Sequence, residues 1–194
     1  MTDNKDNKQE LLRCGLRLFS SRGFDGVSTA DIVSAAGVTK PTMYHYFGSK
    51  EGLLEEILHN HYGNFISELE NAASLPEDIA LTFFRFAKVC FDTARRSPEF
   101  FMLRAGLMMR VGQDTAYLAA KPYIDRESAI IKQFFDTAAS HAGNIKGKET
   151  MCTLSFVGTI NATISAYLQS GDESIISDET IYKLRQQFLY GIYS

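Results

Sequence analysis

Apolar residues recur at helical spacing along almost the whole of this 194-residue chain. Near the N-terminus, Leu12, Leu16 and Phe19 follow an i, i+4, i+7 pattern, which places them on one face of a helix. The sustained alternation of apolar and polar residues that is typical of strands is missing, and no Asn-Gly or Asp-Gly hairpin joins two alternating runs. The spacing therefore predicts an all-α fold.

Capping residues, glycines and prolines divide the chain into about nine predicted helices. The first covers roughly residues 6–21. A variant of the capping box, Ser28 followed by Asp31, begins the second helix, and Gly37 ends it. The third covers residues 40–47. The remaining helices are expected over residues 50–73, 76–97, 99–111, 115–141, 149–169 and 178–193, with a break or bend near Pro122.

The second and third helices are short and are joined by a tight glycine turn, which is the pattern of a helix-turn-helix. The local charge favours a phosphate partner, because acidic residues are absent between Asp31 and Glu51, whereas Lys40, His45 and Lys50 lie within that window. The whole chain carries a net charge of −3. A phosphate backbone nevertheless interacts with the nearby patch rather than with the distant remainder of the protein.

The stretch from Thr29 to Leu53, TADIVSAAGVTKPTMYHYFGSKEGL, resembles the signature of the TetR family of transcriptional regulators. The match extends upstream and covers residues 10–55. The resemblance implies a three-helix DNA-binding domain over residues 1–53 and a larger helical domain for effector binding and dimerisation over residues 54–194. It also implies a homodimer that binds a palindromic operator on double-stranded DNA. Repression until a small-molecule effector releases the operator is the commoner outcome in the family, and activation or effector-assisted binding are the alternatives.

The third helix is the expected recognition helix. Because the N-terminal side chains of such helices reach base edges in the major groove, Lys40 is placed to pair with guanine or with a phosphate. Tyr44 is better suited to fixing the register on the DNA backbone than to distinguishing bases. The resemblance adds several phosphate contacts, so the predicted DNA-binding residues are Thr29, Thr39, Lys40, Thr42, Tyr44, His45, Tyr46 and Lys50.

The region from residue 54 onward is rich in phenylalanine and methionine. Most such residues form ordinary core, but the resemblance implies an effector cavity among the middle helices. Methionine and aromatic side chains suit a small apolar or aromatic effector. The expected ligand-binding residues are Phe65, Phe84, Cys90, Phe91, Met102, Met108 and Tyr123.

The last two predicted helices each carry a regular apolar face. One face consists of small residues at intervals of four, which permit close helix approach, and the other consists of bulky residues. Two such helices from each subunit can pack as a four-helix bundle, as the resemblance implies; the alternative is packing within one chain. The expected dimerisation residues are Gly158, Ala162 and Ala166 on the first helix, and Ile181, Leu184, Phe188 and Ile192 on the second.

An enzyme is the first alternative class, and its motifs are incomplete. Tyr46 and Lys50 have the spacing of a dehydrogenase pair, but no strand with a glycine-rich loop precedes them. Glu55, His59 and His61 do not form a convincing metal site, because the two histidines point to different faces of a helix. We therefore expect no catalytic residue, no metal and no cofactor.

A second alternative is a helix-turn-helix protein that binds DNA without any effector. The cysteines, Cys14, Cys90 and Cys152, lie far apart among apolar neighbours, which is typical of reduced core residues in a cytosolic protein. No run approaches ~18 uninterrupted apolar residues, so the sequence predicts a cytoplasmic protein without a membrane partner.

Overall fold

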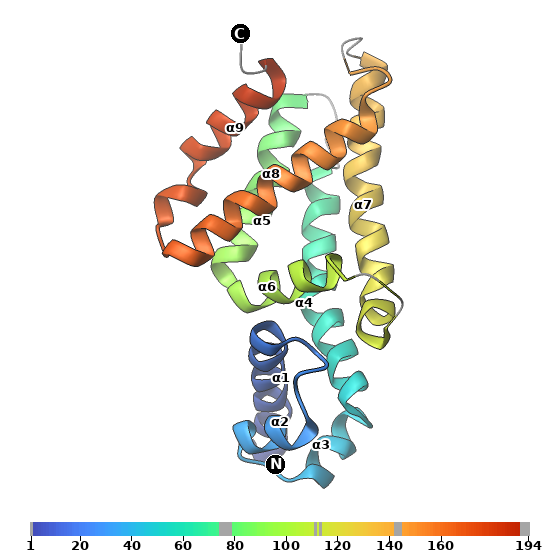
Figure 1. The fold of residues 1–194 in the computed structure, drawn as a ribbon, viewed down its shortest axis with the longest axis vertical. Helices are drawn as coiled ribbons and strands as arrows, with labels where there is room; N and C mark the ends of the chain where they lie inside the picture. Colours follow the sequence, from blue (N-terminus) through green and yellow to red (C-terminus); the bar gives the residue numbers. More distant parts are fainter. Residues whose placement is uncertain (1, 74–78, 111, 113, 142–144, 191–194) are drawn as a thin grey trace. The chain divides into compact units, whose positions relative to one another are not determined.

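The computed structural model describes residues 2–73, 79–110, 112, 114–141 and 145–190. Within these residues the fold is all-helical and contains no strand, which confirms the predicted fold class. A short 3-10 helix, η1 (Glu173–Ile176), follows α8. The α-helices, labelled in Figure 1, are α1 (Thr2–Arg22), α2 (Thr29–Ala36), α3 (Lys40–Phe47), α4 (Lys50–Ala73), α5 (Ile79–Arg96), α6 (Pro98–Met108), α7 (Thr115–His141), α8 (Glu149–Ser170) and α9 (Asp178–Tyr190).

Two helices differ from the expectation in their bounds. α1 begins at Thr2 rather than near residue 6, and α6 ends at Met108 rather than near residue 111. α7 spans the expected residues and continues through Pro122 without a break. A proline inside a helix removes one backbone hydrogen bond and crowds the preceding turn. Ala116 and Ala120, in the turns before Pro122, are fully buried, so tertiary packing holds this part of the helix in place.

Contacts divide the chain into two compact units. Unit 1 comprises Met1–Asn64 and Glu99–Ile124, and unit 2 comprises Phe65–Pro98 and Asp125–Ser194. Helices α4 and α7 therefore contribute residues to both units. The predicted boundary after residue 53 separates DNA binding from effector binding and dimerisation, whereas the two units are defined by contacts. That boundary remains a prediction.

A small apolar core holds α1, α2 and α3 together in unit 1. Ile32 and Met43 are fully buried, and Phe19 is 1% exposed. The rings of Phe19 and Phe24 lie 5.2 Å apart, so the turn after α1 packs on the same core. Because each of these elements buries a large side chain in the same place, the position of α3 is set by packing rather than by its own short length.

The start of α2 has the predicted capping box. The backbone N–H of Asp31 donates to the Ser28 hydroxyl at 3.2 Å, and the backbone N–H of Ser28 donates to the Asp31 carboxylate at 2.8 Å. The Ser28 hydroxyl also donates to the Asp31 carboxylate, and this bond, followed by the one from the Ser28 backbone N–H, lowers the pKa of Asp31 below its ordinary value. Two N–H groups that a helix start leaves unpaired are thereby satisfied, which fixes where α2 begins.

Gly37 ends α2 in the left-handed conformation, with φ of 66°. We expect Gly37→Ala to lower the free energy of unfolding by about 1–2 kcal/mol, because a Cβ atom strains this conformation. Urea denaturation measures the change. As a control, Gly106→Ala in α6 meets open space and ordinary helical geometry, so it should raise stability by up to ~1 kcal/mol. Equal effects of the two substitutions would contradict this account.

A cluster of phenylalanines forms the core of unit 2. Phe156 of α8 is 1% exposed, and its ring centre lies 5.0 Å from that of Phe83, 6.1 Å from Phe86 and 6.2 Å from Phe135. Phe188 of α9 packs against Phe83 at 5.2 Å and against Phe135 at 5.5 Å. These contacts join α5, α7, α8 and α9.

We expect His61 of α4 to make the stability of unit 1 depend on pH. Its ring stacks on Phe100 at 5.7 Å, and burial lowers its pKa below 6.5, against a smaller opposing effect of Glu99. The folded state therefore favours the neutral imidazole, so its contribution is complete above pH 6.5 and is lost as the pH falls through the lowered pKa. We expect the melting temperature to fall from pH 7.5 to pH 5, and to fall less in His61→Gln. Parallel pH profiles would show that His61 does not contribute.

Candidate nucleic-acid interface

α3 is a short helix with one buried side and one side exposed to solvent. It begins after Thr39, and Pro41 occupies its first turn, where a missing N–H leaves no hydrogen bond unmade. Met43 is fully buried and attaches the helix to the core of unit 1. The remaining side chains of α3 are exposed or half-buried, so the helix presents them at a defined position.

We call Thr39, Lys40, Thr42, Tyr44 and His45 the α3 face. Thr39, Lys40 and His45 are exposed, Tyr44 is 46% exposed and Thr42 is half-buried. The hydroxyls of Thr39 and Thr42 are hydrogen-bonded at 2.9 Å. Within the described part of the chain, the Lys40 ammonium makes no hydrogen bond or ion pair, so it is available to an external anion.

Two other predicted DNA-binding residues do not belong to this face. Thr29 is the first residue of α2 and is half-buried. Tyr46 is half-buried, and its ring meets the His45 ring edge-on at 5.4 Å. Tyr46 also lines a hollow behind the end of α3, so it stands at the border between the α3 face and that hollow.

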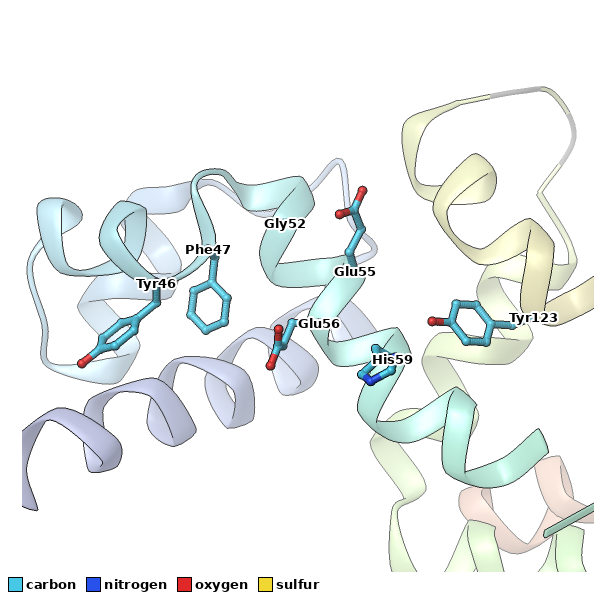
Figure 2. Close-up of a pocket in the computed structure, with 7 residues that line it drawn as sticks. All are labelled: Tyr46, Phe47, Gly52, Glu55, Glu56, His59 and Tyr123. Atoms are coloured by element: carbon cyan, nitrogen blue, oxygen red, sulfur yellow. The ribbon is translucent and has the colours of Figure 1, made fainter. Parts of the chain in front are cut away.

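The hollow measures about 390 Å³ and is drawn in Figure 2. Its lining includes two carboxylates and the aromatic rings of three tyrosine and phenylalanine residues. The Lys8 ammonium donates to Glu56 at 2.8 Å and lies 5.8 Å from the centre of the Phe47 ring, so one carboxylate already has a cation. This acidic lining is unfavourable for phosphate, which leaves the α3 face as the side suited to DNA. The lining residues are Tyr46, Phe47, Gly52, Glu55, Glu56, His59 and Tyr123.

Lys50 lies differently from the remaining predicted DNA contacts. Its ammonium donates to the backbone carbonyl of Phe24 at 3.0 Å and to that of Val27 at 2.9 Å. It also lies 4.0 Å from the centre of the Phe24 ring. The resemblance implied a phosphate contact, whereas the structure turns this charge towards the α1–α2 turn of its own chain.

Sequence reasoning missed a second contact with that turn. The Arg110 guanidinium, just after α6, pairs with Asp25 in the turn and with Asp114 at 2.6 Å. Asp114 in turn accepts a hydrogen bond from the backbone N–H of Tyr117 at 2.9 Å, which caps the start of α7. The spacing of Arg110 and Asp114 signals a local pair, but nothing in the sequence indicates the distant partner Asp25.

The predicted ligand-binding residues are divided between the two units. Phe65, Phe84, Cys90 and Phe91 belong to unit 2, where all but Phe84 are buried. Met102, Met108 and Tyr123 belong to unit 1. Met102 is 46% exposed, Met108 is half-buried, and Tyr123 stacks on Tyr62 at 5.3 Å and lines the hollow of Figure 2. Their role in effector binding remains a prediction.

The small residues predicted for dimerisation lie on an exposed strip of α8. Gly158, Ala162 and Ala166 are all exposed. Leu154 and Met151, which continue the same spacing towards the start of the helix, are 61% and 63% exposed. Neither residue was among those predicted, although Leu154 lies four positions before Gly158 and Met151 three positions before Leu154. We call these five residues the α8 strip.

The bulky stripe of α9 mostly faces its own chain. Ile181 is fully buried, Leu184 is half-buried, and Phe188 packs on the phenylalanine cluster of unit 2. Ile181 therefore belongs to the core of one chain rather than to a surface between chains, which corrects its predicted role. Ile192 lies outside the described residues.

The described residues also bear on metal binding and on membrane insertion. Among them, no group of three or more histidine, cysteine, aspartate or glutamate side chains is placed to hold a metal ion. One helix, α8, is long and apolar enough to cross a membrane, with a mean hydropathy of 1.3 over its best window. Only 17% of that window is buried in the chain.

Known proteins match this chain most clearly in its N-terminal part. Residues 7–57 match the family model described as bacterial regulatory proteins, tetR family. The transcriptional repressor NemR of Escherichia coli K12 is 36% identical over 64 residues, which cover 33% of this chain and 32% of NemR. The transcriptional regulator EthR of Mycolicibacterium smegmatis is 30% identical over 128 residues, which cover 58% and 59%. The chain thus spans less than two thirds of either relative, and both are regulators rather than enzymes.

Solved structures share the fold over nearly the whole chain. The transcriptional regulator FadR from Bacillus subtilis, solved in complex with stearoyl-CoA, has a TM-score of 0.75 at 16% identity, covering 95% of this chain and 99% of FadR. The TetR-family regulator PfmR from Thermus thermophilus has a TM-score of 0.75 at 18% identity, covering 95% and 96%. At these identities the likeness concerns the fold alone. Residues 7–57 of this chain, which contain the helix-turn-helix, thus match the DNA-binding region of the tetR family of bacterial regulatory proteins.

Proposed function

We propose that this chain is a cytoplasmic, homodimeric transcriptional repressor whose α3 enters the major groove of a palindromic operator. The observation that carries the proposal is the α3 face, in which exposed Lys40 and Tyr44 flank the fully buried Met43. A helix held rigidly by a buried anchor presents its polar side chains with little freedom, as recognition requires. α3 itself carries no acidic residue, so nothing on it repels a phosphate.

A second copy of the chain is the proposed partner of the α8 strip. An apolar surface of this kind is unfavourable in water, and the small side chains of Gly158, Ala162 and Ala166 permit another helix to approach closely. A twofold dimer also suits DNA binding, because two α3 helices can then occupy half-sites separated by about 34 Å, one turn of the double helix.

The dimer proposal predicts that Leu154→Glu separates the subunits. The side chain is exposed, so the variant should fold normally, but a charge in an apolar interface is costly to desolvate. Sedimentation velocity should show a dimer for the wild type and for Lys146→Glu, an exposed control in the loop before α8, and a monomer for Leu154→Glu. A monomeric wild type, or wild-type protein that floats with lipid vesicles through α8, would contradict the proposal.

The proposed effector is a small apolar or aromatic molecule bound among the helices after residue 54. Aromatic and thioether side chains in both units, such as Phe84 and Met108, support this chemistry. Because FadR was solved with stearoyl-CoA, a long acyl thioester is a sensible first probe. Effector binding would shift the population of dimers towards a separation of the α3 helices that does not match the operator, with α4 as the lever.

Selection from a random double-stranded DNA library tests the proposed function. We expect the wild type to enrich one inverted repeat whose half-sites lie about 10 base pairs apart, or a multiple of that. The effector is then sought by adding acyl thioesters and aromatic compounds to the complex and measuring release. Enrichment of a sequence that no ligand releases would favour an effector-free DNA-binding protein. Failure to enrich any sequence would contradict the function itself.

A further inference from the structure

The α1–α2 turn, residues 23–28, is held by a positive charge from a distant part of the chain. The Lys50 ammonium, in the first turn of α4, donates hydrogen bonds to the carbonyls of Phe24 and Val27 and lies over the Phe24 ring. Phe24 and Val27 are 4% and 1% exposed, so the turn is packed against the core on one side and against the ammonium on the other.

From this geometry we propose that Lys50 is a positioning residue for DNA binding, which acts through the α1–α2 turn and not by contact with a phosphate. The inference rests on the proposed function. Lys50 is then required at the DNA surface because its charge holds the α1–α2 turn rather than because it attracts a phosphate.

The first argument concerns the partners of the ammonium. A lysine ammonium has three donor hydrogens, and two of them are directed to carbonyls at 2.9 and 3.0 Å. Hydrogen bonds from a charged donor are about twice as strong as neutral ones, and the ring face adds a favourable electrostatic interaction. Turning Lys50 towards DNA would break all of these contacts.

The second argument concerns what the turn controls. Ser28, which caps α2, directly follows Val27, and Thr29 begins α2. A shift of the turn therefore displaces the start of α2 and the predicted DNA contact at Thr29. Because α2 also packs on α3, a displaced turn disturbs the position of the α3 face as well.

Salt dependence separates positioning from phosphate contact. Each lysine that neutralises a phosphate contributes about 0.9 to the slope of log affinity against log salt concentration. We would measure operator binding by fluorescence anisotropy from 50 to 300 mM salt for the wild type, Lys50→Met and Lys50→Arg, at a temperature where circular dichroism shows each variant folded. Lys40→Met is the matched control, because it loses the same charge from an exposed side chain without internal partners.

For Lys50→Met we expect affinity to fall roughly tenfold with an unchanged slope, and the melting temperature to fall by several degrees. Lys50→Arg should recover part of both losses, since it restores a charged donor. Lys40→Met should lower the slope by about 0.9 and leave the melting temperature unchanged. A lower slope in Lys50→Met would overturn the proposal in favour of a phosphate contact, and a lower melting temperature with unchanged affinity would reduce Lys50 to a purely structural role.

Nuclear magnetic resonance tests the same contact without a substitution. In the free wild type we expect a slowly exchanging Lys50 ammonium signal, coupled through hydrogen bonds to the carbonyl carbons of Phe24 and Val27, and unchanged when DNA is added. A fast-exchanging ammonium in the free protein would overturn the inference. If the wild type bound no DNA selectively, the proposed function would fail, whereas this spectrum would still decide whether the contact exists.

Discussion

We expect Lys40→Ala and Tyr44→Ala each to weaken operator binding by about 1–3 kcal/mol, which is a loss of about 5- to 150-fold. Both side chains are exposed on a helix whose opposite side is anchored by Met43. Their removal therefore changes the surface offered to DNA and leaves the core intact. Fluorescence anisotropy with the selected operator measures the loss, and urea denaturation should show both variants as stable as the wild type.

The two variants should differ in their response to salt. Lys40→Ala removes a cation, so the slope of log affinity against log salt should fall by about 0.9, whereas Tyr44→Ala removes a neutral group and should leave the slope unchanged. Lys146→Ala is the control for net charge, because Lys146 is an exposed residue of unit 2. If Lys146→Ala weakened binding as much as Lys40→Ala, the attraction would be diffuse and α3 would not be the recognition helix.

The largest expected loss of stability is that of Phe156→Ala, at about 3–5 kcal/mol. Phe156 is 1% exposed and its ring contacts those of Phe83, Phe86 and Phe135. Truncation to alanine removes these contacts and leaves a cavity that a packed core fills only in part. Urea denaturation at a fixed protein concentration, which keeps any dimer contribution constant, measures the change.

Leu81→Ala is the matched control for this prediction. Leu81 lies on α5 in the same unit but is 42% exposed, so its truncation should cost less than ~1 kcal/mol. Similar losses for the two variants would mean that the phenylalanine cluster is not the core of unit 2. Retained DNA binding by folded Phe156→Ala at low temperature would separate its role in stability from recognition.

The helix-turn-helix could be predicted because its boundaries depend on neighbouring residues. Ser28 with Asp31, and Gly37, determine the ends of α2 through hydrogen bonds and backbone geometry that involve only nearby positions. The predicted third helix coincides with α3, Lys40–Phe47. Most of the predicted DNA contacts lie on or beside α3. They could be predicted because, once the start of a helix is known, its periodicity determines the direction of each side chain.

Contacts between distant residues could not be predicted in this way. Lys50 lies 26 positions after Phe24, the carbonyl of which it binds, so its inward direction depends on how α4 packs on the turn. The stripe containing Ile181 and Phe188 was recognised correctly as apolar. Periodicity predicts that such an apolar face is buried against another helix. Whether that helix belongs to the same chain or to a second copy depends on tertiary packing.

Operator binding by the wild type across a salt series tests the central claim most directly. The comparison is between the selected operator and a shuffled duplex of the same length and composition. We predict at least about 10³-fold tighter binding to the operator at physiological salt, with an affinity for both duplexes that falls steeply as salt is raised. Equal affinity for the two duplexes at every salt concentration would contradict the claim that the α3 face recognises a DNA sequence.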